Sequence, residues 1–302
     1  MQSFNTTNRL LAHIRQGFQV QRLIVWVGIW GIAYLVMRLV PTPGVDFTAG
    51  EGIGMQYAPW VAIVRWPMRS AEIQNAFTLT ILAFALAHYR AKPIHYLCAF
   101  TSLPLYWNLW LCQYDFIPLL GMIWLPWGLP LILVKPQVAG WGLAAWWLRS
   151  SDKWKIVILA LAGLLLSFLV YGLWPFRFSP PATVSTNYNL SAWQWGGTFA
   201  GVVAVGLALF VTAKTRDVDQ AMSLGALATP YAQGHSYLIL VPALARLSGW
   251  RLLVVWLLSW SGMATLFLGE DARALEAIFP LAMWIALCTA SRQLASQKEK
   301  AG

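Results

Sequence analysis

Long uncharged apolar runs recur along the chain from residue 23 to residue 291, separated by short polar segments. A helix needs about 20 apolar residues to cross about 30 Å of hydrocarbon, because it rises about 1.5 Å per residue. The pattern therefore predicts an all-α fold, a polytopic transmembrane helical bundle with about eight full spans. These spans are expected near residues 23–40, 74–89, 94–111, 115–134, 155–174, 196–213, 251–269 and 273–291.

Two further apolar stretches predict elements of a different kind. Residues 138–148 lie between Lys135 and Arg149 and are too few to span, so they predict a short interfacial or re-entrant helix. Residues 221–247 are interrupted by the polar, helix-breaking sequence TPYAQGHS at 229–236. This interruption predicts a broken helical hairpin that enters and leaves on one side of the membrane.

The distribution of basic residues predicts the orientation of the bundle. Cytoplasmic loops collect Lys and Arg, and a cytoplasmic N-terminus places most of them on the inner side. The outer loops are then 41–73 and 175–195, and the C-terminus is also cytoplasmic. The inner segments hold Arg90, Lys92, Lys135, Arg149, Lys153, Lys155, Lys214, Arg216, Arg246, Arg251, Arg292, Lys298 and Lys300, while Arg65, Arg69 and Arg177 are exceptions.

The same pattern divides the chain into three parts. Within residues 1–22, Leu10, Ile14 and Phe18 recur at helical spacing among basic residues, which predicts a cytoplasmic amphipathic, interfacial helix. Residues 23–291 form a single transmembrane domain, and residues 292–302 form a cytoplasmic tail.

Composition narrows the classes of function. Of 302 residues, 59% are hydrophobic and only 11% are charged, which excludes an ordinary soluble domain. The excess of 21 Lys and Arg over 11 Asp and Glu is accounted for by the inner loops, so no nucleic acid partner is expected. The three cysteines have no CxxC spacing, and no nucleotide or metalloprotease motif is present. We therefore expect no metal and no cofactor.

Candidate chemistry begins in the first outer loop. Asp46 follows the first span by a few residues, where a carboxylate faces water and lipid headgroups and can act as a general base on a hydroxyl. Alternatively, it caps a turn after Pro43 and Gly44. Tyr57 is a candidate substrate contact or an ordinary interfacial aromatic residue.

Three more candidates lie further along the chain. Gln113 and Asp115, between two expected spans, can hold sugar hydroxyls or form a plain polar turn. His235 lies inside the broken element, whose exposed backbone groups need a polar cavity. Its imidazole can donate to a phosphate, or it can be hydrogen-bonded within the bundle.

Five short motifs, taken in order, resemble the integral-membrane GT-C glycosyltransferases. The resemblance is to the bacterial branch of polyprenyl-phosphate-mannose-dependent mannosyltransferases and covers about residues 44–245. The motifs are GVDF, YAPW followed by WP, CQYDFIPLL, KPQ and ATPYAQGHSYLILVPAL. The chain departs from the family pattern in a shorter first outer loop, in YAP for Tyr-Pro-Pro, in Cys112 for Gly, and in the lack of an outer soluble domain after the last span.

This resemblance implies a function. A sugar, mannose in that family, would pass from a polyprenyl-phosphate donor to a hydroxyl of a lipid or glycan acceptor at the outer face of the plasma (inner) membrane. Asp46 would be the base, and His235, with help from Arg65 or Arg69, would stabilise the leaving phosphate. Gln113, Asp115, Tyr57 and Tyr231 complete the expected substrate-binding set, and membrane lipids are the other expected partners.

Two rival interpretations remain open from the sequence. One is a non-catalytic subunit that keeps this scaffold and packs in a larger complex. The other is a transporter or flippase. Two observations argue against it: the sequence shows no paired halves, and no charged residue lies deep within an expected span.

Overall fold

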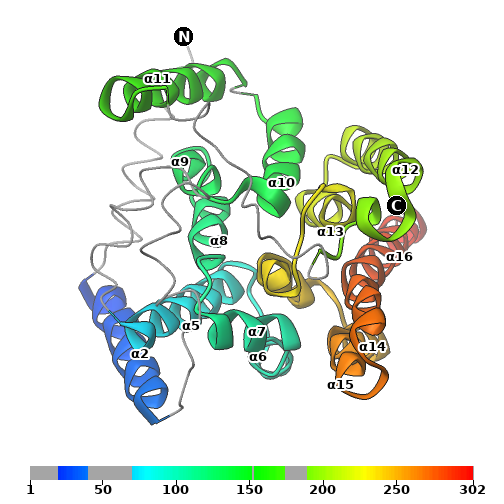
Figure 1. Cartoon of the computed structure of the whole chain (residues 1–302), viewed down its shortest axis with the longest axis horizontal. Helices are drawn as coiled ribbons and strands as arrows, with labels where there is room; N and C mark the ends of the chain where they lie inside the picture. Colours follow the sequence, from blue (N-terminus) through cyan, green and yellow to red (C-terminus); the bar gives the residue numbers. More distant parts are fainter. Residues whose placement is uncertain (1–19, 40–69, 152, 174–188, 302) are drawn as a thin grey trace.

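The computed structural model describes residues 20–39, 70–151, 153–173 and 189–301. Every regular element in these ranges is a helix, which confirms the all-α prediction (Figure 1). The elements are α2 (Val20–Leu39), α5 (Ala71–His88), α6 (Pro93–Phe100), α7 (Leu103–Leu111), α8 (Phe116–Ile123), α9 (Leu129–Ile132), α10 (Pro136–Arg149), α11 (Lys153–Tyr171), α12 (Ala192–Thr215), α13 (Val218–Ala228), the 3₁₀ helix η5 (Gly234–Arg246), α14 (Trp250–Ser259), η6 (Ser261–Ala264), α15 (Thr265–Leu268), η7 (Glu270–Ala277) and α16 (Ile278–Ala301).

Three helical segments of the described chain are long and apolar enough to cross a membrane: 153–171, 192–215 and 274–291. Two shorter apolar helices cover 24–39 and 250–264. In α11, only Ile156 and Ser167 are buried, and Figure 1 shows this helix at the edge of the molecule. A long helix with an exposed apolar surface fits a lipid environment, so these elements support membrane association.

The eight uninterrupted spans expected from hydropathy are not found as eight long helices. The expected span 94–111 is divided into α6 and α7 at Thr101 and Ser102. Pro104 contributes to the break, because proline has no backbone N–H and fits best in the first turn of a helix. The break makes two short helices that pack around the centre of the protein instead of one straight rod.

The expected span 115–134 is wrong in a more consequential way. Its residues form α8 and α9, which lie against each other as a short hairpin. The helices approach closely because Gly121 and Gly128 face one another: a Cβ atom on Gly121 would lie 2.7 Å from the Gly128 carbonyl oxygen. Asp115 and Lys135, which a straight span would place at opposite membrane faces, are therefore neighbours.

The predicted break in residues 221–247 is found between α13 and η5, which form a hairpin. Its open ends are tied by Arg246, which donates to Asp217 at 2.7 Å and to Asp219 at 2.6 Å. The break begins at Thr229, whose hydroxyl donates to the Gln137 carbonyl oxygen at 2.6 Å. The polar break is therefore anchored on α10, the helix that occupies the predicted short element 138–148.

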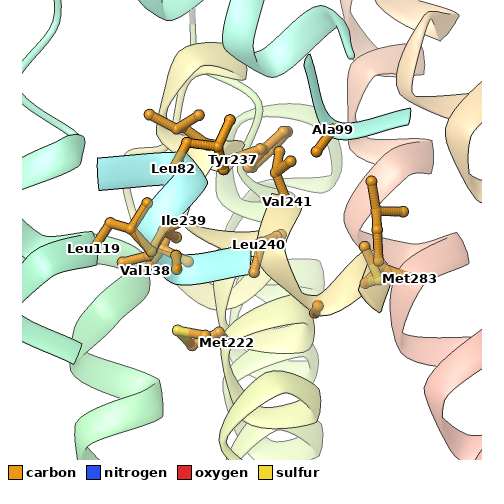
Figure 2. Packing of buried hydrophobic residues seen from close by; sticks show 14 of the residues in the cluster. Leu82, Ala99, Leu119, Val138, Met222, Tyr237, Ile239, Leu240, Val241 and Met283 are labelled. Atoms are coloured by element: carbon orange, nitrogen blue, oxygen red, sulfur yellow. The ribbon is translucent and has the colours of Figure 1, made fainter. Parts of the chain in front are cut away.

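Helix η5 forms the centre of the core. All residues from His235 to Leu244 are buried, and η5 packs against α6, α7 and α16 among others. Figure 2 shows Tyr237, Leu240 and Val241 among buried side chains that include Leu82 of α5 and Met283 of α16. An element enclosed in this way holds any polar side chain at its start in a fixed position.

Candidate functional site

A buried polar cluster joins three elements that are far apart in the sequence. Asp115 precedes α8, Lys135 precedes α10, and His235 lies in the first turn of η5. The Lys135 Nζ atom lies 2.8 Å from both carboxylate oxygens of Asp115. The His235 Nδ1 atom lies 2.8 Å from Asp115 Oδ2 and 3.3 Å from Lys135 Nζ. We call these three residues the Asp–Lys–His cluster.

Neighbouring amides complete the hydrogen bonding of the Asp–Lys–His cluster. Asn108 Nδ2 donates to Asp115 Oδ2 at 3.1 Å, and Lys135 Nζ donates to Gln113 Oε1 at 3.3 Å. Gln233 contacts His235 Nε2 with one amide atom and the Tyr231 hydroxyl with the other. The cluster is thus extended toward Tyr231 by a continuous chain of polar side chains.

The cluster is almost closed to solvent. Asp115 is 3% exposed, His235 4% and Lys135 7%. A cavity of about 10 Å³ adjoins it, lined by Gln137 and Ser236 among others. This space holds about one water molecule, so nothing larger enters without a movement of the surrounding loops.

The charges in the cluster compensate one another. Burial alone would raise the pKa of Asp115, but Lys135 and His235 beside it hold that pKa below its ordinary value. Burial and the neighbouring Lys135 ammonium lower the pKa of His235 to about 4, so this imidazole is neutral at pH 7. One anion, one cation and one neutral imidazole remain, which is a buried ion pair with a hydrogen-bonding partner.

The structure brings four of the eight predicted site residues into one region. Asp115 and His235 are in direct contact, Gln113 reaches the cluster through Lys135, and Tyr231 reaches it through Gln233. The other four predicted residues, Asp46, Tyr57, Arg65 and Arg69, lie outside the described residues.

Three members of the site were not predicted from the sequence. Lys135 had been interpreted as a positive flank at the inner end of a span, although it begins the KPQ motif. Asn108 and Gln233 carried no signal of their own, except that Gln233 lies in the polar break. In the described part of the chain, no group of three or more His, Cys, Asp or Glu side chains could hold a metal ion.

Lys135 is the member of this charge-balanced cluster that could bind an anion. The Lys135 ammonium has three donor hydrogens, and it can exchange a carboxylate oxygen for a phosphoryl oxygen. His235 supplies a neutral imidazole, and Asp115 keeps the cation in place. Asp115 and Lys135 must each keep an opposite charge beside them, because a single unpaired charge in the protein interior is costly.

The comparisons with known proteins give no match: no family model, no curated protein and no solved structure is similar to this chain.

Proposed function

We propose that the chain is a membrane glycosyltransferase that moves a sugar from a polyprenyl-phosphate donor to a hydroxyl acceptor at the extracytoplasmic face. One observation carries the proposal. Three of the motifs that resemble the GT-C family, CQYDF, KPQ and PYAQGHS, supply Asp115, Lys135 and His235. These residues lie 20 and 100 positions apart, yet they meet within 3.3 Å. This meeting of three motif residues at one buried point is the observation that supports the proposal.

In this proposal, the donor phosphate is held by Lys135 and His235. The acceptor oxygen attacks the anomeric carbon, the bond from that carbon to the phosphate oxygen breaks, and polyprenyl phosphate leaves. The acceptor proton passes to Asp46, and a single displacement inverts the anomeric centre. Lys135 stabilises the negative charge that grows on the departing phosphate. Such electrostatic stabilisation of the transition state is usually the largest single contribution to catalysis. Arg65 or Arg69 would assist it.

The closed cavity sets a condition on this mechanism. Only about 10 Å³ is free beside Gln137 and Ser236, so donor binding must open the polar break at 229–233 or the turn at 113–115. Both segments lie between helices and not within them. Opening at either place would let the donor phosphate contact the Lys135 ammonium while one Asp115 oxygen stays paired with it.

A test of the proposal measures transfer from polyprenyl-phosphate-[¹⁴C]mannose to octyl mannoside and octyl glucoside by the purified chain in nanodiscs. The Asp46→Asn variant should lose about 10²-fold to 10⁴-fold in turnover, because it cannot accept the acceptor proton. Lys214→Gln, which changes an exposed cation outside the five motifs, is the control and should transfer at the original rate. Equal turnover in Asp46→Asn and in the original chain would remove Asp46 as the base.

A second candidate function is a non-catalytic membrane subunit with the same scaffold. The observation that favours it is the complete internal pairing of the Asp–Lys–His cluster, which needs no ligand to satisfy its charges. If the chain is such a subunit, we expect no sugar transfer by the original chain from the polyprenyl-phosphate donor. We also expect the folded protein to tolerate neutral replacements in the cluster, provided that the charges of Asp115 and Lys135 are removed together.

A further inference from the structure

A second polar region lies beside Gly234, the residue of η5 that directly precedes His235. The Glu276 side chain, from η7, packs against Gly234 and leaves no room there for a Cβ atom. Its stem packs in the same way against Gly262 of η6, so the carboxylate is held between two backbone segments. Trp107 of α7 also reaches Gly234: a Cβ atom there would lie 3.4 Å from Cδ1 of the indole ring. A carboxylate and an indole ring therefore meet next to the Asp–Lys–His cluster.

Tyr237 lies on the same face of η5 as Gly234. Residues three positions apart are eclipsed in a 3₁₀ helix, so Tyr237 follows Gly234 by one turn. The Tyr237 ring packs against Phe279, three residues after Glu276, with 6.4 Å between the ring centroids. Burial and the nearby Glu276 carboxylate raise the pKa of Tyr237. The Tyr237 hydroxyl therefore belongs to the same polar region, and we call Glu276, Trp107 and Tyr237 the Glu–Trp–Tyr group.

Two donors of the Glu–Trp–Tyr group have no hydrogen-bond partner in the part of the chain that the structure describes. They are the Trp107 indole N–H and the Tyr237 hydroxyl, and both polar atoms are buried. Tyr237 as a whole is 1% exposed, so bulk solvent does not reach its hydroxyl. A buried donor without an acceptor costs free energy, and a ligand that supplies the acceptor would recover it.

The combination of these three side chains selects for a neutral hydroxyl ligand. An organic ammonium could pair with Glu276, but it could not accept from Trp107 or Tyr237. An anion could accept from both donors, but the Glu276 carboxylate would repel it. A hydroxyl donates to a carboxylate and also accepts from an N–H or O–H group, so a polyol satisfies all three side chains. Glu276 and Trp107 are only partly buried, so they offer surface to such a ligand.

We infer that the Glu–Trp–Tyr group binds the sugar ring of the donor, with Glu276 accepting from its hydroxyls and with Trp107 and Tyr237 donating to its oxygens. The donor sugar is the expected ligand because Gly234 directly precedes His235, which contacts the donor phosphate in the proposed function. The inference rests on that function for the identity of the ligand. It assigns recognition of the sugar to residues outside the Asp–Lys–His cluster.

The first test measures binding of methyl α-mannoside to the full chain in nanodiscs by saturation-transfer difference NMR, which requires no sugar transfer. Glu276→Gln should weaken mannoside binding at least about 10-fold, because hydrogen bonds to a charged acceptor are the stronger ones. Tyr237→Phe should weaken it about 3-fold without lowering the thermal unfolding temperature, because it removes a buried hydroxyl that has no partner. Glu72→Gln, the same change at a carboxylate beside Ser70, is the matched control and should bind mannoside unchanged.

The second test separates this inference from the proposed function by transfer kinetics. Glu276→Gln should raise the KM for polyprenyl-phosphate-mannose at least about 10-fold and leave the KM for octyl mannoside unchanged. Transfer with an unchanged donor KM in this variant would overturn the inference alone. Mannoside binding that depends on Glu276, in a chain that transfers no sugar, would support the sugar site and contradict the transferase activity. Binding of choline more tightly than mannoside, no mannoside binding by the original chain, or unchanged binding in both folded variants would also overturn the inference.

Discussion

Lys135→Met is expected to lower the free energy of unfolding by about 3–5 kcal/mol, because it leaves the Asp115 carboxylate buried without its cation. Asp115 is 3% exposed, and Lys135 contacts both of its oxygens at 2.8 Å. Asn108 still donates to the carboxylate, but its amide carries no charge that could replace the ammonium. His235 stays in contact with the carboxylate, and its burial opposes the gain of a positive charge. The measurement is SDS-induced unfolding of the purified chain in mixed micelles.

The double variant Asp115→Asn/Lys135→Met is the control that separates charge from packing. Removal of both charges leaves no buried ion, so most of the lost stability should return. A double variant as unstable as Lys135→Met alone would mean that the Lys135 side chain acts through its volume. A fully stable Lys135→Met would mean that Asp115 and Lys135 are not paired in the folded protein.

Gly128→Ala is expected to destabilise the chain by about 1–3 kcal/mol, because its methyl group overlaps the Gly121 backbone. The neighbouring atoms are a carbonyl group and a Cα atom, which cannot rotate away as a side chain can. Gly128 has an ordinary right-handed backbone conformation, so the expected effect is purely steric. The same SDS unfolding measurement checks it.

Gly163→Ala in α11 is the matched control. A Cβ atom on Gly163 would meet nothing within 4 Å, and alanine is a better helix former than glycine by about 0.5–1 kcal/mol. This variant should therefore be at least as stable as the original chain. If Gly128→Ala were equally harmless, the close contact between Gly121 and Gly128 in the α8–α9 hairpin would be contradicted.

The sequence predicted the elements that polar residues interrupt. The α13–η5 hairpin was found because TPYAQGHS is a polar break in an apolar run, and such a break has few structural solutions inside a protein. The short helix α10 was predicted because Lys135 and Arg149 lie at the two ends of its apolar stretch. In both cases, the chain changes composition where it changes direction.

Residues 115–134 show where this approach fails. After Asp115 the segment has no charged residue, so hydropathy gives it the length of a span and contains no information on a turn within it. Pro126, Gly128 and Pro130 are the helix-breaking residues that could have indicated the turn. The close packing of α8 against α9 depends on Gly121 and Gly128, because the backbone of each approaches the other where a side chain would not fit. A contact between two particular residues is a property of the fold, and periodicity along the chain does not encode it.

The same error explains the incomplete prediction of the site. Asp115 and His235 stood out as polar residues in apolar surroundings, and they do meet. Lys135 was placed at the opposite membrane face because the hairpin was read as a crossing. The ion pair between Lys135 and Asp115 was therefore not predicted, because it depends on the path of the chain from Asp115.

The most direct test of the proposed function compares mannose transfer from polyprenyl-phosphate-mannose by the original chain and by Asp115→Asn/Lys135→Gln, both shown to be folded by thermal unfolding. The proposal predicts transfer by the original chain and a loss of at least about 10²-fold in the neutral pair, as expected when a principal donor to the leaving group is removed. Transfer at the same rate in both proteins would contradict the proposed role of Lys135. The absence of transfer by the folded original chain would contradict the proposed transferase activity.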